Sequence, residues 1–260
     1  MSDIEPLLTI MRRLRDPDTG CPWDGQQTLA SLVPYTLEEA YEVAETIEQG
    51  ALSALPDELG DLLFQVVFYA RIAEEQGRFD FADVVRKICD KLVRRHPHVF
   101  ADARVESAEE QTREWEAHKQ RERQRQGSGG SLLDGVSLAL PALTRAVKLQ
   151  RRAARAGFDW PSVEGVLDKV REEMGEVEAE LRDRPEPAKV AAEIGDLLFS
   201  VVNLARHLEV DPETALRQAN RRFERRFAWV ETRLRAAGGI EQASVAEMDA
   251  AWEEAKQAER

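Results

Sequence analysis

The chain has 260 residues and a formal net charge of -13, with 36 lysine and arginine residues against 49 aspartate and glutamate residues. This acidic balance argues against binding to a nucleic-acid backbone, which rewards a basic protein surface. The hydrophobic fraction of 43% is sufficient for a core in each of about two domains.

Membrane insertion and secretion are not indicated. The longest apolar stretch, residues 62–70, contains Gln65 and is far shorter than the roughly 20 residues of a membrane-spanning helix. The first residues are charged throughout and lack the apolar core of a signal peptide. Cys21 and Cys89 are far apart in the sequence and do not form a CxxC motif, so both are expected to be reduced thiols. We therefore expect a cytoplasmic protein with no membrane contact.

Helical periodicity runs through almost the whole chain. In the segment 59–70, apolar residues recur at three- and four-residue spacing, which predicts a helix with one core face, and 194–205 repeats this pattern. Turns are expected at 16–17, 21–22, 49–50, 76–77, 96–97, 184–185 and 238–239, where proline or glycine interrupts the pattern. No β pattern of useful length occurs. An exposed polar helix is expected at 113–126 and a flexible joint at the GSGGS sequence, 127–131.

Two parts of the sequence repeat one another. ELGDLLFQVVFYAR starts at Glu58, and EIGDLLFSVVNLAR starts at Glu193. EEAYEV from Glu38 precedes the first, and EEMGEV from Glu172 precedes the second, at offsets of 134 and 135 residues for the two motifs. The sequence therefore predicts an all-α protein with tandem duplicated helical domains, 1–125 and 136–260, joined by a linker at 126–135.

The acidic motifs indicate metal chemistry. Acids three residues apart share a helix face, so each EExxE motif offers two carboxylates and each ExxD motif offers two more. If the two helices pack as a hairpin, four carboxylates converge, and their repulsion requires a cation. Oxygen ligands without cysteine or histidine favour Mg²⁺, with Mn²⁺ as a substitute. The two candidate quartets are Glu39, Glu42, Glu58 and Asp61 in the first half, and Glu173, Glu176, Glu193 and Asp196 in the second.

The same acids also have structural explanations. Acidic pairs are common on solvated helix faces, and Thr36 with Glu39 fits a capping box at a helix start. The second copy has Val170 at the position of Thr36, so capping cannot explain both motifs. A di-iron site needs Glu-x-x-His motifs, and neither acidic motif supplies a histidine.

Other conspicuous residues have simpler interpretations beside the functional one. His96 and His98 flank Pro97, which is typical of a helix end. Trp252 would either stack on a base or dock a terminal helix, and docking is favoured. Trp23 and Trp160 are expected to pack at the starts of the acidic helices. A basic cluster would either grip phosphates or form a salt-bridged helix face: Arg221, Arg222, Arg225 and Arg226.

These motifs together resemble the MazG family of nucleoside triphosphate pyrophosphohydrolases, in the all-α pyrophosphatase superfamily. The resemblance rests on the tandem EExxE and ExxD motifs, the GDLLF helix, GCPWD, RRHPHVF and NLARH, and it spans nearly the whole chain. It implies a homodimer whose four-helix-type packing is completed by the second chain. It also implies Mg²⁺-dependent hydrolysis of nucleoside triphosphates to monophosphate and pyrophosphate, with the two quartets as metal ligands.

The resemblance further suggests nucleotide contacts in the second half, from Lys169, Lys189, Arg222, Arg226 and Trp252. Glu172 is the candidate proton acceptor. Relatives often carry another acid just before ExxD, where this chain has Ala191 and Ala192. The second half is expected to be the active one, because its basic run is longer and is followed by Trp252. The competing hypothesis is a regulatory nucleotide- or protein-binding dimer whose acidic clusters are structural.

Overall fold

The computed structural model describes residues 4–101, 107, 131–182, 185–235 and 238–259. Regular structure in these ranges is helical, without a β-strand, as the periodicity predicts. The chain divides into two compact units, residues 1–122 and 123–260. The predicted polar helix at 113–126 and most of the predicted joint at 127–131 lie outside the described residues. No helix in the described part is long and apolar enough to cross a membrane.

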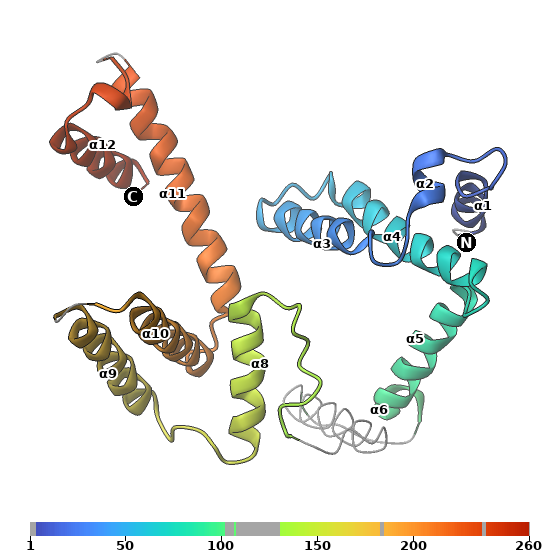
Figure 1. The fold of residues 1–260 in the computed structure, drawn as a ribbon, viewed down its shortest axis with the longest axis horizontal. Helices are drawn as coiled ribbons and strands as arrows, with labels where there is room; N and C mark the ends of the chain where they lie inside the picture. Colours follow the sequence, from blue (N-terminus) through green and yellow to red (C-terminus); the bar gives the residue numbers. More distant parts are fainter. Residues whose placement is uncertain (1–3, 102–106, 108–130, 183–184, 236–237, 260) are drawn as a thin grey trace. The chain divides into compact units, whose positions relative to one another are not determined.

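The first unit is built around a hairpin of two helices (Figure 1). Its helices are α1 (Glu5–Leu14), α2 (Pro22–Gln26), α3 (Val33–Glu48), α4 (Leu55–Glu75), α5 (Phe81–Arg95) and α6 (Pro97–Phe100). Helix α4 packs against both α3 and α1. The core between these elements contains Met11, Leu32, Val67, Phe68 and Ile72, each no more than 2% exposed. The long apolar helix predicted from the repeat is therefore the central element of this unit.

Local sequence signals explain where these helices begin and end. Gly50 and Gly77 have φ angles of 70° and 65°, which glycine adopts at little cost, and they follow the ends of α3 and α4. Helix α5 ends at Arg95, with His96 as its cap and Pro97 opening α6, so the predicted helix end is confirmed. The structural alternative for Glu39, a capping box with Thr36, is also excluded by the structure. Helix α3 already begins at Val33, and the Thr36 hydroxyl donates to the carbonyl oxygen of the preceding turn.

The second unit repeats the hairpin and adds a long helix. Its elements are α8 (Ala142–Arg155), α9 (Val163–Arg182), α10 (Pro187–His207), α11 (Pro212–Leu234), η2 (Ile240–Gln242) and α12 (Val245–Ala258). Helix α10 packs against α9 and α8, and α12 packs against α11. Ser244 and Glu247 form a capping box that starts α12. Helices α9 and α10 thus correspond to α3 and α4, as the duplicated sequence predicts.

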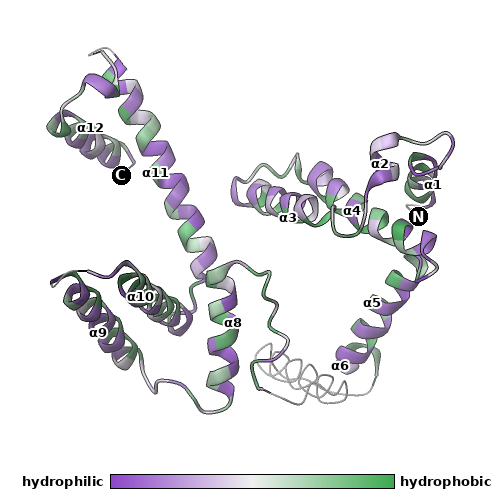
Figure 2. Ribbon diagram, in the orientation of Figure 1, coloured by the Kyte–Doolittle hydropathy of each residue, from purple (hydrophilic) through white to green (hydrophobic). Residues whose placement is uncertain are grey.

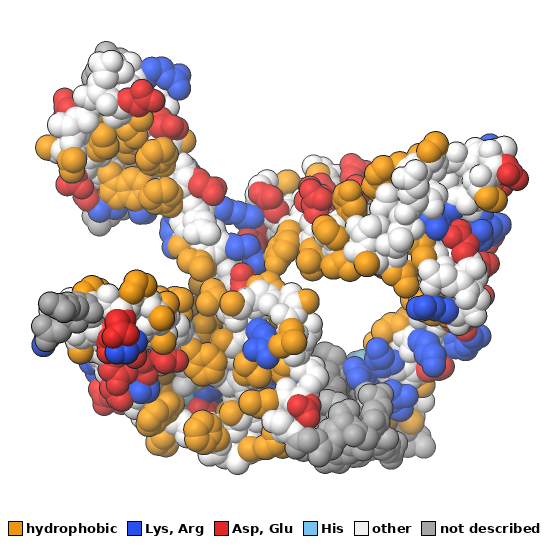
Figure 3. Space-filling view, viewed as in Figure 1, with side chains coloured by type: hydrophobic (Ala, Val, Ile, Leu, Met, Phe, Trp, Pro, Cys, Tyr) orange, Lys and Arg blue, Asp and Glu red, His pale blue; other side chains and the backbone are white. Residues whose placement is uncertain are grey.

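Both units expose an apolar stripe at equivalent positions of the repeated helix. In α4 it consists of Leu59, Leu63 and Val66, and in α10 it consists of Ile194, Leu198 and Val201. Hydrophobic residues alternate with polar ones along these helices in Figure 2, and Figure 3 shows hydrophobic side chains at the surface of each unit. All six side chains are between 37% and 52% exposed. The two stripes are the apolar surface that the predicted dimer would cover.

Candidate metal and nucleotide site

Three carboxylates from two helices meet in the second unit. Glu173 on α9 and Glu193 and Asp196 on α10 each offer an oxygen atom, and these atoms lie within 4.8 Å of one another. The i,i+3 spacing in α10 puts Glu193 and Asp196 on one helix face, and the packing of α9 against α10 brings Glu173 to them. We call these three residues the acidic trio. It is the one group of this kind among the described residues.

One oxygen atom of the acidic trio has no protein partner. The Glu173 side chain is 6% exposed, and its Oε1 accepts an ion-pair contact from Lys169 Nζ at 2.7 Å. Its Oε2 is buried and makes no hydrogen bond. An ionised carboxylate oxygen in this position is costly unless a cation or donor reaches it. The unpaired oxygen therefore fits a metal ion, and an all-oxygen ligand set suits Mg²⁺ or Mn²⁺.

Glu176 is near the acidic trio, but its carboxylate oxygens do not lie within 4.8 Å of the ligand atoms of all three residues. Desolvation, followed by the charge of Glu173, raises the pKa of its carboxyl, and Glu193 adds to the shift. The structure therefore brings all four predicted second-half acids into one electrostatic neighbourhood and places three of them at ligand distance.

Lys169 is the positive charge nearest to the acidic trio in the described contacts. Its Nζ lies 2.9 Å from Glu172 Oε1 as well as 2.7 Å from Glu173 Oε1. The hydrogen bond to Glu173, and then the one to Glu172, raises the pKa of the lysine, which is therefore charged at neutral pH. Glu172, the predicted proton acceptor, is 58% exposed and is held by this lysine. Lys189 is further out, paired with Glu186 at 3.0 Å near the start of α10.

The quartet of the first unit is assembled less tightly. Desolvation raises the pKa of Glu39, and the charges of Asp61 and Glu42 raise it further, so these three acids are neighbours. In the described residues, however, they and Glu58 do not reach the mutual ligand distance of the acidic trio. Gln65 Nε2 donates to Glu39 Oε1 at 3.5 Å. An amide occupies this side of the cluster, where the second unit has Ser200.

A cavity of about 600 Å³ lies beside the acidic trio in the second unit. Lys169 belongs to both, because it lines the cavity and contacts Glu173. The walls come from α8, α9, α10, the segment between α8 and α9, and one residue that precedes α8. They consist of Leu133, Leu149, Gln150, Ala153, Gly157, Phe158, Asp159, Trp160, Val166, Lys169, Phe199, Ser200, Asn203 and Arg206. A volume of this size is typical of small-molecule sites.

Bulky aromatic side chains stand at two counterpart positions of the first unit. Phe68, at the position of Asn203, is 0% exposed and makes an edge contact with Phe64, with ring centroids 5.6 Å apart. Tyr35 stands where the second unit has Lys169. The small cavity found in this unit, about 180 Å³, lies instead between α1, α4 and the start of α5.

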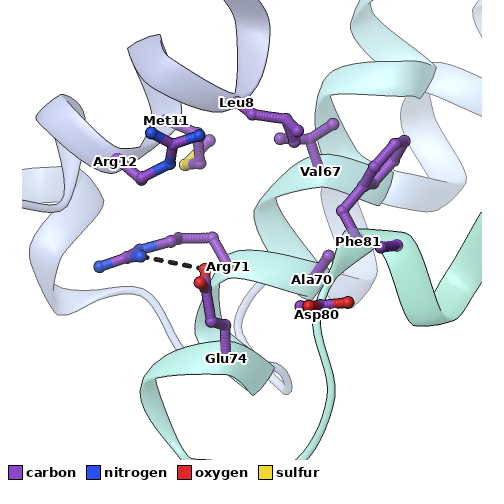
Figure 4. A pocket seen from close by; sticks show the side chains of 10 residues that line it. Leu8, Met11, Arg12, Val67, Ala70, Arg71, Glu74, Asp80 and Phe81 are labelled. Carbon is purple, nitrogen blue, oxygen red and sulfur yellow. Dashed lines mark hydrogen bonds and ion pairs between the residues drawn. The ribbon is translucent and has the colours of Figure 1, made fainter. Parts of the chain in front are cut away.

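Figure 4 shows this small cavity, in which the Arg71–Glu74 ion pair lies beside Met11, Val67 and Phe81. None of the four first-half acids lines it. It is therefore a gap in the helix packing with a charged rim, separate from the first quartet.

The predicted basic cluster and Trp252 form a group of their own on α11 and α12. Arg225 and Arg226 both form ion pairs with Glu259, at 2.6 and 2.7 Å. Arg226 also lies over the Trp252 ring, 5.8 Å from its centroid. Trp252 packs against the core of this helix pair, so its predicted docking role is confirmed. Arg222 is exposed on the same helix. Among the described contacts, none joins these residues to the acidic trio.

Sequence reasoning missed the residues that shape the cavity. Gln150 lies outside the quoted motifs, and Phe199 and Asn203, which belong to GDLLF and NLARH, were given no role of their own. The packing of α8 on α10 brings the three together. Trp160 was expected to pack at the start of α9. It does so, since a Cβ on Gly165 would lie 3.2 Å from its ring, but it also lines the cavity.

Comparison with known proteins places this geometry in a family. A model of the MazG nucleotide pyrophosphohydrolase domain matches residues 27–100 and 162–230, which include both acidic motifs of each half. The chain belongs to the MazG family. The nucleoside triphosphate pyrophosphohydrolase of Escherichia coli K12 is 52% identical over 100% of the chain and 99% of its own length.

Two further relatives also align over 97% of the chain. The nucleoside triphosphate pyrophosphohydrolase/pyrophosphatase MazG of Thermotoga maritima is 43% identical, and the alignment covers 95% of its length. The uncharacterized protein YabN of Bacillus subtilis is 44% identical, and the alignment covers 51% of its length. The tandem MazG arrangement is therefore found in relatives of similar length and within a longer protein.

The pKa of Glu176 gives a first prediction. A raised carboxyl pKa means that the ionised form weakens folding at neutral pH, and that this cost disappears as the pH falls below the ordinary value of 4.5. We expect Glu176→Gln to raise the Tm in chelator at pH 7 and to leave it unchanged near pH 4. Thermal unfolding followed by circular dichroism measures both.

Glu164 on the same helix supplies the matched control. A hydrogen bond from Ser162 lowers the pKa of its carboxyl, so the ionised form stabilises the fold. Glu164→Gln should therefore lower the Tm at pH 7. A Tm that moves in the same direction for both variants would contradict this electrostatic interpretation.

Proposed function

We propose that the chain is a Mg²⁺-dependent nucleoside triphosphate pyrophosphohydrolase and that its second unit carries the reaction. The observation that carries the proposal is the unpaired, buried Glu173 oxygen within the acidic trio, which Lys169 connects to a cavity large enough for a nucleoside. The relatives from E. coli and T. maritima are named for this activity. The products would be a nucleoside monophosphate and pyrophosphate.

The acidic trio and Glu176 would hold the metal. When bound there, Mg²⁺ would neutralise triphosphate charge and lower the pKa of a coordinated water. The protein residues have the remaining tasks. Lys169 would turn from Glu173 to the substrate phosphates once a cation replaces it as the counter-charge. Glu172, released by the same movement, would accept the proton of the attacking water.

The bond changes follow from the products. The water oxygen bonds to the α-phosphorus, and the bond from this atom to the oxygen bridging the β-phosphate breaks. The bridging oxygen leaves as part of pyrophosphate, and the proton of the water passes to the carboxylate. Arg222, Arg225, Arg226 and Lys189 are proposed to stabilise phosphate charge, and Trp252 is proposed as a further nucleotide contact. Glu259 would have to release Arg225 and Arg226 for this role, since it holds both of them.

We further propose that the first quartet, Glu39, Glu42, Glu58 and Asp61, is a weaker metal site. Three of its acids, Glu39, Glu42 and Asp61, share an electrostatic neighbourhood. Tyr35 and Phe68, however, stand where the second unit has Lys169 and Asn203. A metal bound there would lack both the adjoining lysine and the adjoining cavity. Turnover should therefore depend chiefly on the second quartet.

The reaction is tested by product analysis of matched variants. With Mg²⁺, the wild type should release pyrophosphate and monophosphate from several nucleoside triphosphates, and chelator should abolish this release. Asp196→Asn removes one metal ligand charge, and we expect turnover to fall by about a hundredfold or more, the scale for lost transition-state charge stabilisation. Asp61→Asn, the equivalent change in the first unit, should cost much less.

Three results would contradict this proposal. Orthophosphate and diphosphate as products would show cleavage at another bond. Nucleotide binding without hydrolysis would instead favour a regulatory binding protein. A larger loss from Asp61→Asn than from Asp196→Asn would place the reaction in the first unit.

We also propose that the chain forms a homodimer through the apolar stripes of α4 and α10. A two-helix hairpin cannot bury both of its apolar faces alone, and the equivalent stripes of both units are exposed. A second chain would complete a four-helix arrangement around them. Burying about half of each side chain would contribute favourable transfer free energy at roughly 25 cal/mol per Å² of apolar surface.

Sedimentation velocity at micromolar concentration tests the dimer. The wild type should sediment as a dimer, and the double variant Leu198→Glu, Val201→Glu should shift it towards monomer, because charges in an apolar interface are costly to desolvate. Leu138→Glu is the control, since Leu138 is 84% exposed and lies outside the helices. A wild-type monomer at this concentration would contradict the proposal.

A further inference from the structure

The cavity beside the acidic trio has apolar walls and a small polar set. Trp160, Phe158 and Phe199 contribute aromatic surface, and Leu149 and Val166 contribute aliphatic surface. Two amide side chains, from Gln150 and Asn203, interrupt these walls. A few fixed polar groups within an apolar cavity are the usual means of orienting a ligand.

Gln150 presents a hydrogen-bond acceptor that the protein leaves unused. The residue is 7% exposed, and its Nε2 donates to the carbonyl oxygen of Phe199 at 2.8 Å. A carbonyl oxygen only accepts, so the nitrogen must face Phe199 and the orientation of the amide is determined by chemistry. Gln150 Oε1 is buried and has no hydrogen-bond partner. A buried acceptor in a cavity wall is complemented by an N–H group of a ligand.

Asn203 is oriented in the opposite sense. Its Oδ1 accepts from Arg206 Nε at 2.9 Å and from Arg206 Nη2 at 2.8 Å. A guanidinium only donates, so the oxygen must face Arg206, and the Nδ2 donors are left for a ligand. Arg206 is itself fixed, because Asp159 Oδ2 accepts from its Nη1 at 3.0 Å and His207 contacts the same aspartate. This network makes Asn203 a rigid donor.

The position of Asn203 along α10 relative to the acidic trio suits the length of a nucleotide. Asn203 follows Asp196 by two turns of α10, and Ser200 lies one turn after Asp196. Seven residues of helix correspond to about 10 Å along the axis, a distance that a ribose and its first phosphate span. Lys169 lies between the two ends, in contact with Glu173 and in the cavity wall.

We propose that this cavity binds the nucleobase and that Gln150 and Asn203 determine which bases it accepts. This inference rests on the proposed function. Gln150 Oε1 accepts an N–H of the base edge, and Asn203 Nδ2 donates to the adjacent carbonyl oxygen or ring nitrogen. The ligand class is a nucleobase with an N–H donor beside an acceptor, held between Trp160 and Phe199. A base whose edge N–H is replaced by N–CH₃ leaves the buried acceptor unpaired and adds a methyl group against it.

Uridine triphosphate and its N3-methyl derivative test the proposal, because they differ in one substituent at the base edge. The methyl group removes the N3–H donor and keeps both carbonyl groups, the ribose and the triphosphate. We expect wild-type kcat/KM to be at least about tenfold lower for the methylated nucleotide, because a site built to pair a polar group rejects an analogue that lacks it. Pyrophosphate release measures both rates.

Two variants test whether Gln150 and Asn203 cause this discrimination between the two nucleotides. Gln150→Met has similar length and removes the unpaired acceptor, so the ratio of the two kcat/KM values should approach one while the Tm is kept or raised. Asn203→Asp retains an oxygen for Arg206 and replaces the donor with an acceptor. It should lower kcat/KM for uridine triphosphate at least about tenfold, mainly through KM, with the fold preserved by the stronger Arg206 contact.

Gln65→Met is the matched control. Gln65 is also a buried glutamine with an unpaired Oε1, but it lies in the first unit. The ratio for this variant should equal that of the wild type. The base-pocket proposal would be overturned, with hydrolysis left intact, if the wild type had equal kcat/KM values for the two nucleotides. It would also be overturned if Gln150→Met kept the wild-type ratio and Asn203→Asp kept the wild-type KM. If the wild type released no pyrophosphate from these two nucleotides or from any other nucleoside triphosphate, the proposed function itself would be refuted.

Discussion

Repulsion among carboxylates that face each other across two packed helices is the interaction on which the second unit depends. Glu173 is almost fully buried at the α9–α10 contact, with Glu193 and Asp196 opposite it. Two like charges 4 Å apart repel by about 1 kcal/mol in water and about 4 kcal/mol near a protein surface. A hairpin with such a contact needs a nearby positive charge. Lys169 supplies one within the chain, and the unpaired Glu173 oxygen leaves room for a second.

The same constraint separates the two halves of the duplication. Both helix hairpins keep their acids, but their surroundings differ at three aligned positions. Tyr35 replaces the lysine, Gln65 replaces Ser200, and Phe68 replaces Asn203. Gln65 donates to Glu39, while Phe68 fills the core of the first unit. The first hairpin is thus closely packed at the position of Phe68, which favours stability. The second hairpin has a cavity beside its acidic trio.

The sequence predicted local features well because they depend on neighbours along the chain. The helix containing 59–70 and its copy at 194–205 were visible as apolar periodicity, and both form the central helix of their unit. Acids three residues apart indicated a shared helix face, and Glu193 and Asp196 do lie together. The Thr36–Glu39 spacing imitates a cap, but the helix begins at Val33 with Pro34 in its first turn.

The cavity could not be predicted in this way. Gln150 and Phe199 are 49 residues apart in sequence and meet only through the packing of α8 on α10. The orientation of each amide depends on a partner that no local pattern reveals, a backbone carbonyl in one case and a guanidinium in the other. Likewise, the sequence left the basic run on α11 open between a phosphate contact and a salt-bridged helix face. The pairing of Arg225 and Arg226 with Glu259, at the end of α12, became visible only in three dimensions.

The central claim, that the α9–α10 carboxylates form the principal metal site, is tested most directly by Mn²⁺ binding followed by electron paramagnetic resonance of the free ion. Mn²⁺ is chosen because oxygen ligands that suit Mg²⁺ also bind it. The account predicts that Glu193→Gln weakens the tightest class of Mn²⁺ sites at least about tenfold, while Glu58→Gln, its counterpart in the first unit, leaves that class unchanged. Equal weakening by both variants, or tight binding retained in Glu193→Gln, would contradict it.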